Sequence, residues 1–221
     1  MAKIGPIFFI ILRSYVKRLK NMITVSEHIY IHDSKIKYYP IKSSGSGGQR
    51  INKVSTAILL KYEIQDQIEA AKVMAKLSYV DKDKISIFGW SYGGYMTLLG
   101  MTKGADYFKA GISIAPVTNW RYYDNIYTER FMRTPQENAS GYDENSPINH
   151  VDKLKGNYLL IHGTADDNVH VQNSMGMVDA LVKNNVDFDM FIYTNKNHGI
   201  YGGFTRLHLY NKMLKFTLDN L

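Results

Sequence analysis

Apolar runs alternate with segments of helical spacing along most of the chain after residue 62. Residues 62–78 carry apolar side chains three or four positions apart, which predicts a helix with one apolar face. Four strand-like runs then alternate with four helix-like segments: 85–88, a helix after Ser91, 110–115, a helix near 122–131, 158–161, a helix at 171–183, 188–193, and a closing helix from about Thr205. This order predicts an α/β fold with a mostly parallel sheet and helices on both faces.

The first part of the chain fits this alternation poorly. Residues 4–12 are apolar enough for a buried strand or short helix, and the basic residues at 13–20 predict a solvated helix after it. Residues 43–48, Ser-Ser-Gly-Ser-Gly-Gly, are typical of a flexible turn or linker. We therefore expect a divergent segment over 1–50, which contributes at most to an incomplete sheet, and one main domain over 51–221.

The same segment predicts neither a membrane span nor export. Residues 4–12 are shorter than the roughly 20 apolar residues that cross a bilayer. A secretory signal peptide places its basic residues before the apolar stretch, whereas most of them follow it here.

Charge and composition exclude several classes of function. The net charge is +7, but residues 1–61 hold 11 Lys or Arg against Glu27 and Asp33, and the remainder holds 16 against 18 acids. A near-neutral main domain does not indicate nucleic-acid binding. The chain has no cysteine, and its seven histidines form no HExxH pair, so we expect no metal and no other cofactor.

Residues 89–94, Gly-Trp-Ser-Tyr-Gly-Gly, contain GxSxG between a predicted strand and a predicted helix. In such a turn the serine has a strained backbone, and glycine is expected two positions to either side because the strand and helix crowd there. The extra Gly94 favours close packing. The hydroxyl of Ser91 would project from the sheet, and the N–H of Tyr92 would face a developing oxyanion.

A serine nucleophile needs a base, and the base needs an acid that fixes its tautomer. In α/β-hydrolases the order along the chain is serine, acid, histidine. Asp166 follows the strand at 158–161 and is the predicted acid, with Asp167 as the alternative, although a helix-capping role suits Asp167 as well. His198 follows the next strand and is the predicted base. His162 is expected to pack at its strand end and His170 to begin a helix.

With these residues placed, the chain resembles the dipeptidyl-peptidase IV branch of the prolyl oligopeptidase family from about Tyr62 to Leu221. The motifs that carry the resemblance are YEIQDQIEAAK at 62–72, GWSYGGY at 89–95, APVTNW at 115–120, YTERFM at 127–132, HGTADDNVH at 162–170 and NHG at 197–199. The resemblance implies an α/β-hydrolase fold with Ser91, Asp166 and His198 as a catalytic triad. It also implies a substrate pocket lined by Tyr92, Val117, Trp120, Tyr123, Tyr127 and Val169, with Asn168 hydrogen-bonded to a substrate carbonyl.

By the same resemblance, the enzyme releases N-terminal dipeptides after a penultimate Pro or Ala through an acyl-enzyme. An aromatic box suits the flat apolar ring of proline, although the same aromatic residues could simply form core. Relatives are periplasmic or extracellular and dimerise partly through their last helix. Here an apolar face of Tyr210, Met213, Leu214 and Phe216 could do this or could dock on the sheet.

Two family features have no counterpart in this sequence. A β-propeller whose paired glutamates hold the substrate amino terminus is not recognisable, and no tyrosine precedes Tyr15 to serve as the family's second oxyanion donor. A truncated or rearranged gene product would explain both departures. An inactive or weakly active remnant or binding scaffold, and a stand-alone esterase of the same fold, therefore remain as alternatives.

Overall fold

The computed structural model describes residues 7–10, 22–26, 29–32 and 64–221, with side chains from residue 64 onward. The chain divides into two compact units, one of residues 1–10 and 49–221 and the other of residues 11–48. In the second unit β2 (Met22–Ser26) pairs antiparallel with β3 (Ile29–His32). The helix predicted at 13–20 and the linker at 43–48 lie outside the described residues, and the domain division at residue 50 stays a prediction.

The larger unit is built on a five-stranded sheet in the order β1-β4-β5-β6-β7. All of its neighbouring strands pair in parallel. The strands are β1 (Ile7–Ile10), β4 (Ile85–Trp90), β5 (Ala110–Ile114), β6 (Asn157–Gly163) and β7 (Asp189–Tyr193). The predicted parallel sheet is confirmed, and the described part of the apolar stretch 4–12, Ile7–Ile10, is a strand of it rather than a helix.

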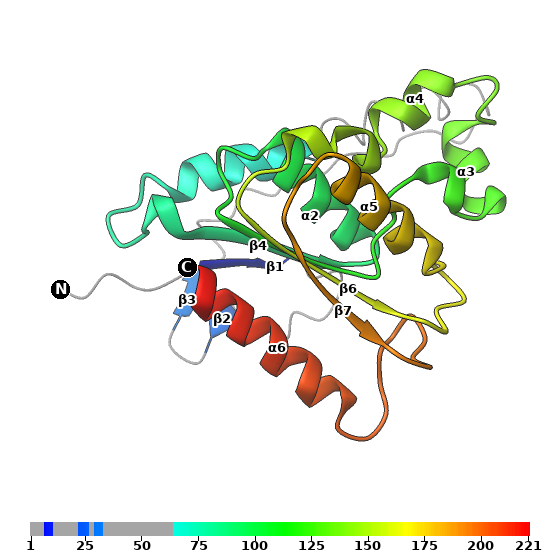
Figure 1. The fold of residues 1–221 in the computed structure, drawn as a ribbon. Coiled ribbons are helices and arrows are strands. Elements are labelled where there is room, and N and C mark those ends of the chain that lie inside the picture. The colour runs from blue at the N-terminus through cyan, green and yellow to red at the C-terminus, as the bar shows by residue number, and fades with distance from the viewer. Residues whose placement is uncertain (1–6, 11–21, 27–28, 33–63) are drawn as a thin grey trace. The chain divides into compact units, whose positions relative to one another are not determined.

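Helices cover both faces of this sheet, as Figure 1 shows with α2 and α5 on one side and α6 on the other. Successive side chains of a strand point to opposite faces. In β6 accordingly, Tyr158 and Leu160 pack in the cluster with α2 and α5, whereas Leu159 and Ile161 pack in the cluster with α6. β6 is therefore apolar on both faces, which explains its continuous apolar run.

The long helices follow the predicted order. They are α2 (Tyr92–Lys103), α5 (Gln172–Lys183) and α6 (Thr205–Asn220), with a short 3-10 turn η2 (Lys82–Lys84) before β4. The helix predicted over 62–78 is wrong at its end, because the described helix covers 64–74. Lys76 and Leu77 bond to carbonyls three residues back, so the chain turns while Leu77 still packs on the core. His170 does not begin α5, which starts two residues later.

The connection from β5 to β6 contains more structure than predicted. It holds η3 (Trp120–Tyr122), α3 (Asn125–Met132), α4 (Ala139–Glu144) and η4 (Pro147–Lys153). Two fully buried polar side chains fix its first turn: Ser146 Oγ accepts from the Trp120 N–H, and Asn173 Oδ1 accepts from the Thr118 N–H at 3.0 Å. These bonds hold the segment 118–120 at one position above the sheet.

The final helix divides its apolar side chains between two environments. Met213 and Phe216 are buried with Leu209 in the cluster on the sheet, whereas Tyr210 and Leu214 are each 52% exposed. Of the apolar face expected from the sequence, Met213 and Phe216 therefore dock on the sheet, whereas Tyr210 and Leu214 face outward.

None of the helices in the described residues is both long enough and apolar enough to cross a membrane.

Candidate active site

Ser91 is the single residue between the end of β4 at Trp90 and the start of α2 at Tyr92. Its φ of 59° and ψ of −119° are a conformation that costs free energy for a residue with a Cβ atom. The Ser91 N–H donates to the Ile114 carbonyl of the neighbouring strand at 2.8 Å, which anchors the turn to the sheet. The Ser91 hydroxyl makes no capping bond to α2. The strained serine turn predicted from the sequence is present.

The glycines around the serine do not all have the same role. A Cβ on Gly89 would lie 2.2 Å from the backbone of Gly93, and one on Gly94 would lie 3.0 Å from the Ile114 carbonyl. Crowding therefore requires glycine at 89 and favours it at 94. A Cβ on Gly93 would meet nothing within 4 Å, so the expectation that its own side is crowded is wrong. Gly93 is the neighbour that excludes a side chain from Gly89.

Asp166 lies in the loop after β6 and is the acid that contacts His198. Its Oδ1 accepts from the N–H groups of Asn168 and Val169, both at 3.0 Å, and its Oδ2 accepts from His198 Nδ1 at 2.7 Å. The Asp166 side chain is fully buried, whereas Asp167 is exposed. Of the two candidates from the sequence, only Asp166 bonds to the predicted base.

Two opposing effects act on the ionisation of Asp166. Burial by itself would raise the pKa of its carboxyl group. Hydrogen bonds from His162, His198 and the Asn168 N–H outweigh burial and hold this pKa well below its usual value. Asp166 is therefore an ionised acceptor for the ring of His198.

His198 is presented by the loop that follows β7. The indole N–H of Trp90 donates to the His198 carbonyl at 2.8 Å, so the residue before Ser91 holds the backbone of the histidine. The loops of the acid and the histidine are also joined, because the Ala165 N–H donates to Lys196 and the Asn195 N–H donates to Thr164 Oγ1. The His198 side chain is 22% exposed, so solvent reaches the ring while Asp166 is sealed beneath it.

The predicted pocket residues form an aromatic cluster around Trp120. Its ring lies 6.1 Å from Tyr92, 6.2 Å from Tyr123 and 6.4 Å from Tyr127, with the last pair stacked. Trp120 is buried, but Tyr127 is 42% exposed. The cluster therefore has a buried base and an open rim, unlike a sealed core.

The remaining predicted pocket residues lie beside this cluster. Val117 and Val169 are buried in the same apolar core as Trp120, and Asn168 is exposed. The Tyr123 hydroxyl donates to Asn168 Oδ1 at 2.7 Å. Burial and the nearby Asp124 raise the pKa of Tyr123, so its hydroxyl stays protonated and continues to donate. This bond joins the aromatic cluster to the loop of Asp166.

His162 contacts Asp166, and no pattern in the sequence predicts this contact. The structure confirms that His162 is packed at the end of β6, where it is fully buried. Its Nε2 also lies 3.1 Å from Asp166 Oδ2, and its Nδ1 lies 2.6 Å from Ser174 Oγ. A histidine four residues before an aspartate is too common a spacing to reveal such a contact.

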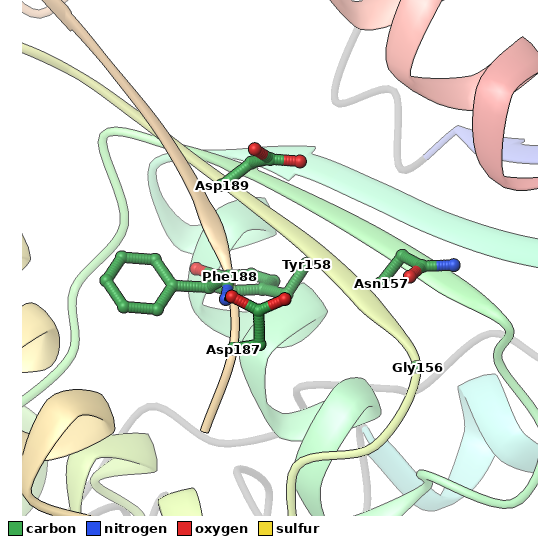
Figure 2. A pocket seen from close by; sticks show the side chains of 6 residues that line it. All are labelled: Gly156, Asn157, Tyr158, Asp187, Phe188 and Asp189. Atoms are coloured by element: carbon green, nitrogen blue, oxygen red, sulfur yellow. The ribbon is translucent and has the colours of Figure 1, made fainter. Parts of the chain in front are cut away.

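A separate hollow of about 160 Å³ lies at the amino ends of β6 and β7, and Figure 2 shows the side chains that line it. It is lined by Gly156, Asn157, Tyr158, Asp187, Phe188 and Asp189. These residues lie at or just before the amino ends of β6 and β7, whereas Asp166 and His198 follow the carboxyl ends. The hollow therefore contains none of the predicted site residues. Within the described residues, no group of three or more His, Asp or Glu is placed to hold a metal ion.

The parallel sheet covered on both faces and the serine turn at the end of β4 define an α/β-hydrolase fold. The chain belongs to the prolyl oligopeptidase family of S9 peptidases, whose family model matches residues 41–221. The match begins before Tyr62, where the first motif starts.

Two curated relatives and one solved structure illustrate the likeness. Dipeptidyl peptidase 4 from Sus scrofa is 38% identical over 97% of this chain and 27% of that protein. Dipeptidyl aminopeptidase B from Saccharomyces cerevisiae is 45% identical over 78% of this chain and 22% of that protein. The crystal structure of Porphyromonas gingivalis dipeptidyl peptidase 4 matches with a TM-score of 0.72 and 56% identity, covering 74% of this chain and 23% of that one. The chain thus spans about a quarter of the length of these relatives.

Proposed function

We propose that the chain is the catalytic portion of a serine peptidase that releases N-terminal dipeptides after a penultimate Pro or Ala. Ser91 is the nucleophile, His198 the base and Asp166 the acid that orients it. The observation that carries the proposal is the 2.7 Å bond between Asp166 and His198, whose backbone carbonyl accepts from Trp90, the residue before the strained Ser91. Membership of the prolyl oligopeptidase family and relatives named dipeptidyl peptidase support the substrate class.

The proposed reaction has two half-steps. Ser91 Oγ attacks the substrate carbonyl carbon while its proton passes to His198 Nε2, and the N–H of Tyr92 stabilises the oxyanion. The amine leaves with that proton, which leaves a dipeptidyl ester on Ser91. Water then attacks the ester, again with His198 as base, and frees the dipeptide and the serine. Asp166 holds the proton on Nδ1, so Nε2 faces the reaction as an acceptor.

Substrate selection is assigned to the aromatic cluster and Asn168. Trp120 and its tyrosine neighbours would contact both faces of a proline ring, with Val117 and Val169 packed in the adjoining core. Asn168 Oδ1 accepts the Tyr123 hydroxyl, so the amide Nδ2 is the group that donates to a substrate carbonyl. The hydrogen bond from Tyr123 thus sets the orientation of the Asn168 amide.

Covalent labelling tests the proposed nucleophile. A fluorophosphonate is expected to modify Ser91, as mapped by peptide mass spectrometry, and a Ser91→Ala variant should give no adduct. Hydrolysis of Gly-Pro-p-nitroanilide should exceed hydrolysis of p-nitrophenyl acetate, because only the first has a proline ring for the cluster. The reverse preference would assign an esterase. A folded chain that neither labels nor turns over would contradict the proposed function and favour an inactive remnant.

We also propose that the enzyme forms a homodimer through α6. Its outward side chains Leu207, Tyr210, Leu214 and Leu218 follow one another at helical spacing and are between 52% and 67% exposed. Sedimentation velocity on the wild type and a Leu214→Glu variant tests this. The charge should convert a dimer to a monomer without changing the circular-dichroism spectrum, and a wild-type chain that is monomeric at micromolar concentration would rule the dimer out.

A further inference from the structure

One carboxylate oxygen in the site accepts from two imidazole rings. Asp166 Oδ2 lies 2.7 Å from His198 Nδ1 and 3.1 Å from His162 Nε2. His198 is partly exposed, whereas His162 is completely buried. The proposed reaction uses only the first ring. The second is a buried titratable group that contacts the proposed acid, and catalysis so far gives it no role.

The neighbours of His162 determine where its proton lies. Nε2 faces Asp166 Oδ2 and also the Val169 carbonyl oxygen at 2.8 Å. An ionised carboxylate and a carbonyl oxygen can only accept, so Nε2 carries the proton. On the other side of the ring, Nδ1 lies 2.6 Å from Ser174 Oγ, and the hydroxyl can donate to it. A neutral ring with its proton on Nε2 satisfies all of these contacts.

We propose that His162, locked by Ser174, is a positioning residue that holds the Asp166 carboxylate in the orientation that His198 requires. The proposal rests on the proposed function, because it assigns a role in the same site. Two backbone N–H groups fix Asp166 Oδ1, and His162 supplies the second donor to Oδ2. The carboxylate is thereby held from both oxygens, and rotation about its terminal bond would break at least one hydrogen bond.

The network also links two secondary-structure elements to the acid. His162 lies in β6 and Ser174 lies in the first turns of α5, and both are fully buried. Val169, whose N–H binds Oδ1 and whose carbonyl binds His162, closes the ring of contacts. An orientation fixed by a strand, a helix and a loop together is more rigid than one fixed by the loop alone, as a catalytic group requires.

A matched pair of variants separates positioning from simple packing. His162→Leu fills a similar volume but removes the contacts with Asp166, the Val169 carbonyl and Ser174. His162→Gln retains an N–H₂ group that can donate to Asp166 and a carbonyl that can accept from Ser174. If His162 only fills space, leucine should serve as well as glutamine. If it positions Asp166, glutamine alone should preserve the rate.

The rates to measure are fluorophosphonate labelling of Ser91 and kcat for Gly-Pro-p-nitroanilide. We expect His162→Leu to lower both by about 10- to 100-fold, with KM unchanged, because a small displacement of a catalytic group has this effect. His162→Gln should recover most of the loss. Wild-type rates in His162→Leu, or equal loss in both variants, would overturn the proposal.

A spectroscopic measurement tests the network without relying on activity. Ring-nitrogen correlations in ¹⁵N-labelled wild-type protein at neutral pH should show His162 with its proton on Nε2, and a proton on Nδ1 would overturn the proposal. A wild type that shows this tautomer but never labels would count against the proposed function and not against the network. If His162→Leu does not fold, Ser174→Ala removes the lock but keeps the ring, and unchanged labelling would then contradict the proposal.

Discussion

The indole N–H of Trp90 donates to the carbonyl oxygen of His198 at 2.8 Å, although 108 positions separate the two residues in the chain. Trp90 ends β4 immediately before Ser91, so the strand that carries the serine also holds the backbone of the histidine. Arg206 reinforces this contact, because its guanidinium lies over the Trp90 ring and donates to the Gly199 carbonyl. The Trp90 side chain thus couples the position of the proposed nucleophile, Ser91, to that of the proposed base, His198.

Replacing Trp90 with phenylalanine should slow acylation without unfolding the domain. The change keeps an aromatic ring but deletes the donor to His198, so the histidine loop gains freedom. We expect the labelling rate of Ser91 to fall by about 10-fold or more, given the sensitivity of catalysis to small displacements. A Tyr107→Phe variant, altered at an exposed ring away from the site, should label like the wild type. Equal rates in both variants would dissociate the Trp90 contact from catalysis.

The two glycines of the serine turn should respond oppositely to alanine. Gly89→Ala places a methyl group 2.2 Å from the Gly93 backbone, so β4 and α2 must separate. We expect a loss of about 1–3 kcal/mol or more in the free energy of unfolding, as for overpacked cores. Gly93→Ala meets no atom within 4 Å and adds a good helix former, so its stability should match or exceed the wild type. Urea unfolding of both variants checks this, and similar losses would contradict it.

Much of the fold could be predicted because its strands and helices have different apolar periods. Buried parallel strands such as β6 appear as continuous apolar runs, and α5 as spacing of three and four. The helix predicted at 62–78 fails beyond residue 74 because Leu77 keeps the apolar spacing while the backbone turns. The short α4 and η4 were missed because no apolar period marks residues 139–153.

The candidate site also has residues that could be predicted from the sequence and others that could not. Ser91, Asp166 and His198 could be chosen because the order of strand, turn and polar residue is visible in the sequence. The second ring on Asp166 could not, because a buried histidine at the end of a strand has the same sequence pattern whatever its nitrogens contact. The hydrogen bonds of Ser146 and Asn173 could not be predicted either, because their partners Trp120 and Thr118 lie 26 and 55 positions away along the chain.

Removing the ring of Tyr127 should weaken substrate selection while leaving the chemistry intact. This ring stacks on Trp120 and packs edge-on against Tyr123, yet it is partly exposed at the rim of the cluster. In Tyr127→Ala we expect KM for Gly-Pro-p-nitroanilide to rise by about 2- to 10-fold, the equivalent of one aromatic contact. Hydrolysis of p-nitrophenyl acetate, which has no ring for this position, should not change. Tyr127→Phe is the control, and equal effects on both substrates would refute a role in selection.

The lowered pKa of Asp166 predicts how stability depends on pH. Its carboxyl group has a pKa below the value of about 3.9 that applies to an unfolded aspartate, so ionisation favours the folded state. This contribution is complete above the unfolded pKa and is lost as pH falls toward the folded pKa. Asp166→Asn cannot ionise and should be less stable than the wild type at pH 7, with a difference that narrows below about pH 5.

Urea unfolding midpoints at pH 7, 5, 4 and 3 measure this narrowing. The titratable groups that face Asp166 are His162 from β6, His198 from the loop after β7, and Tyr123 from the aromatic cluster. Asp167→Asn is the matched control, because it changes an exposed neighbour and leaves both histidine rings in place. That control should follow the wild type at every pH. A difference between Asp166→Asn and the wild type that stays constant down to pH 3 would show that the Asp166 charge does not stabilise the fold.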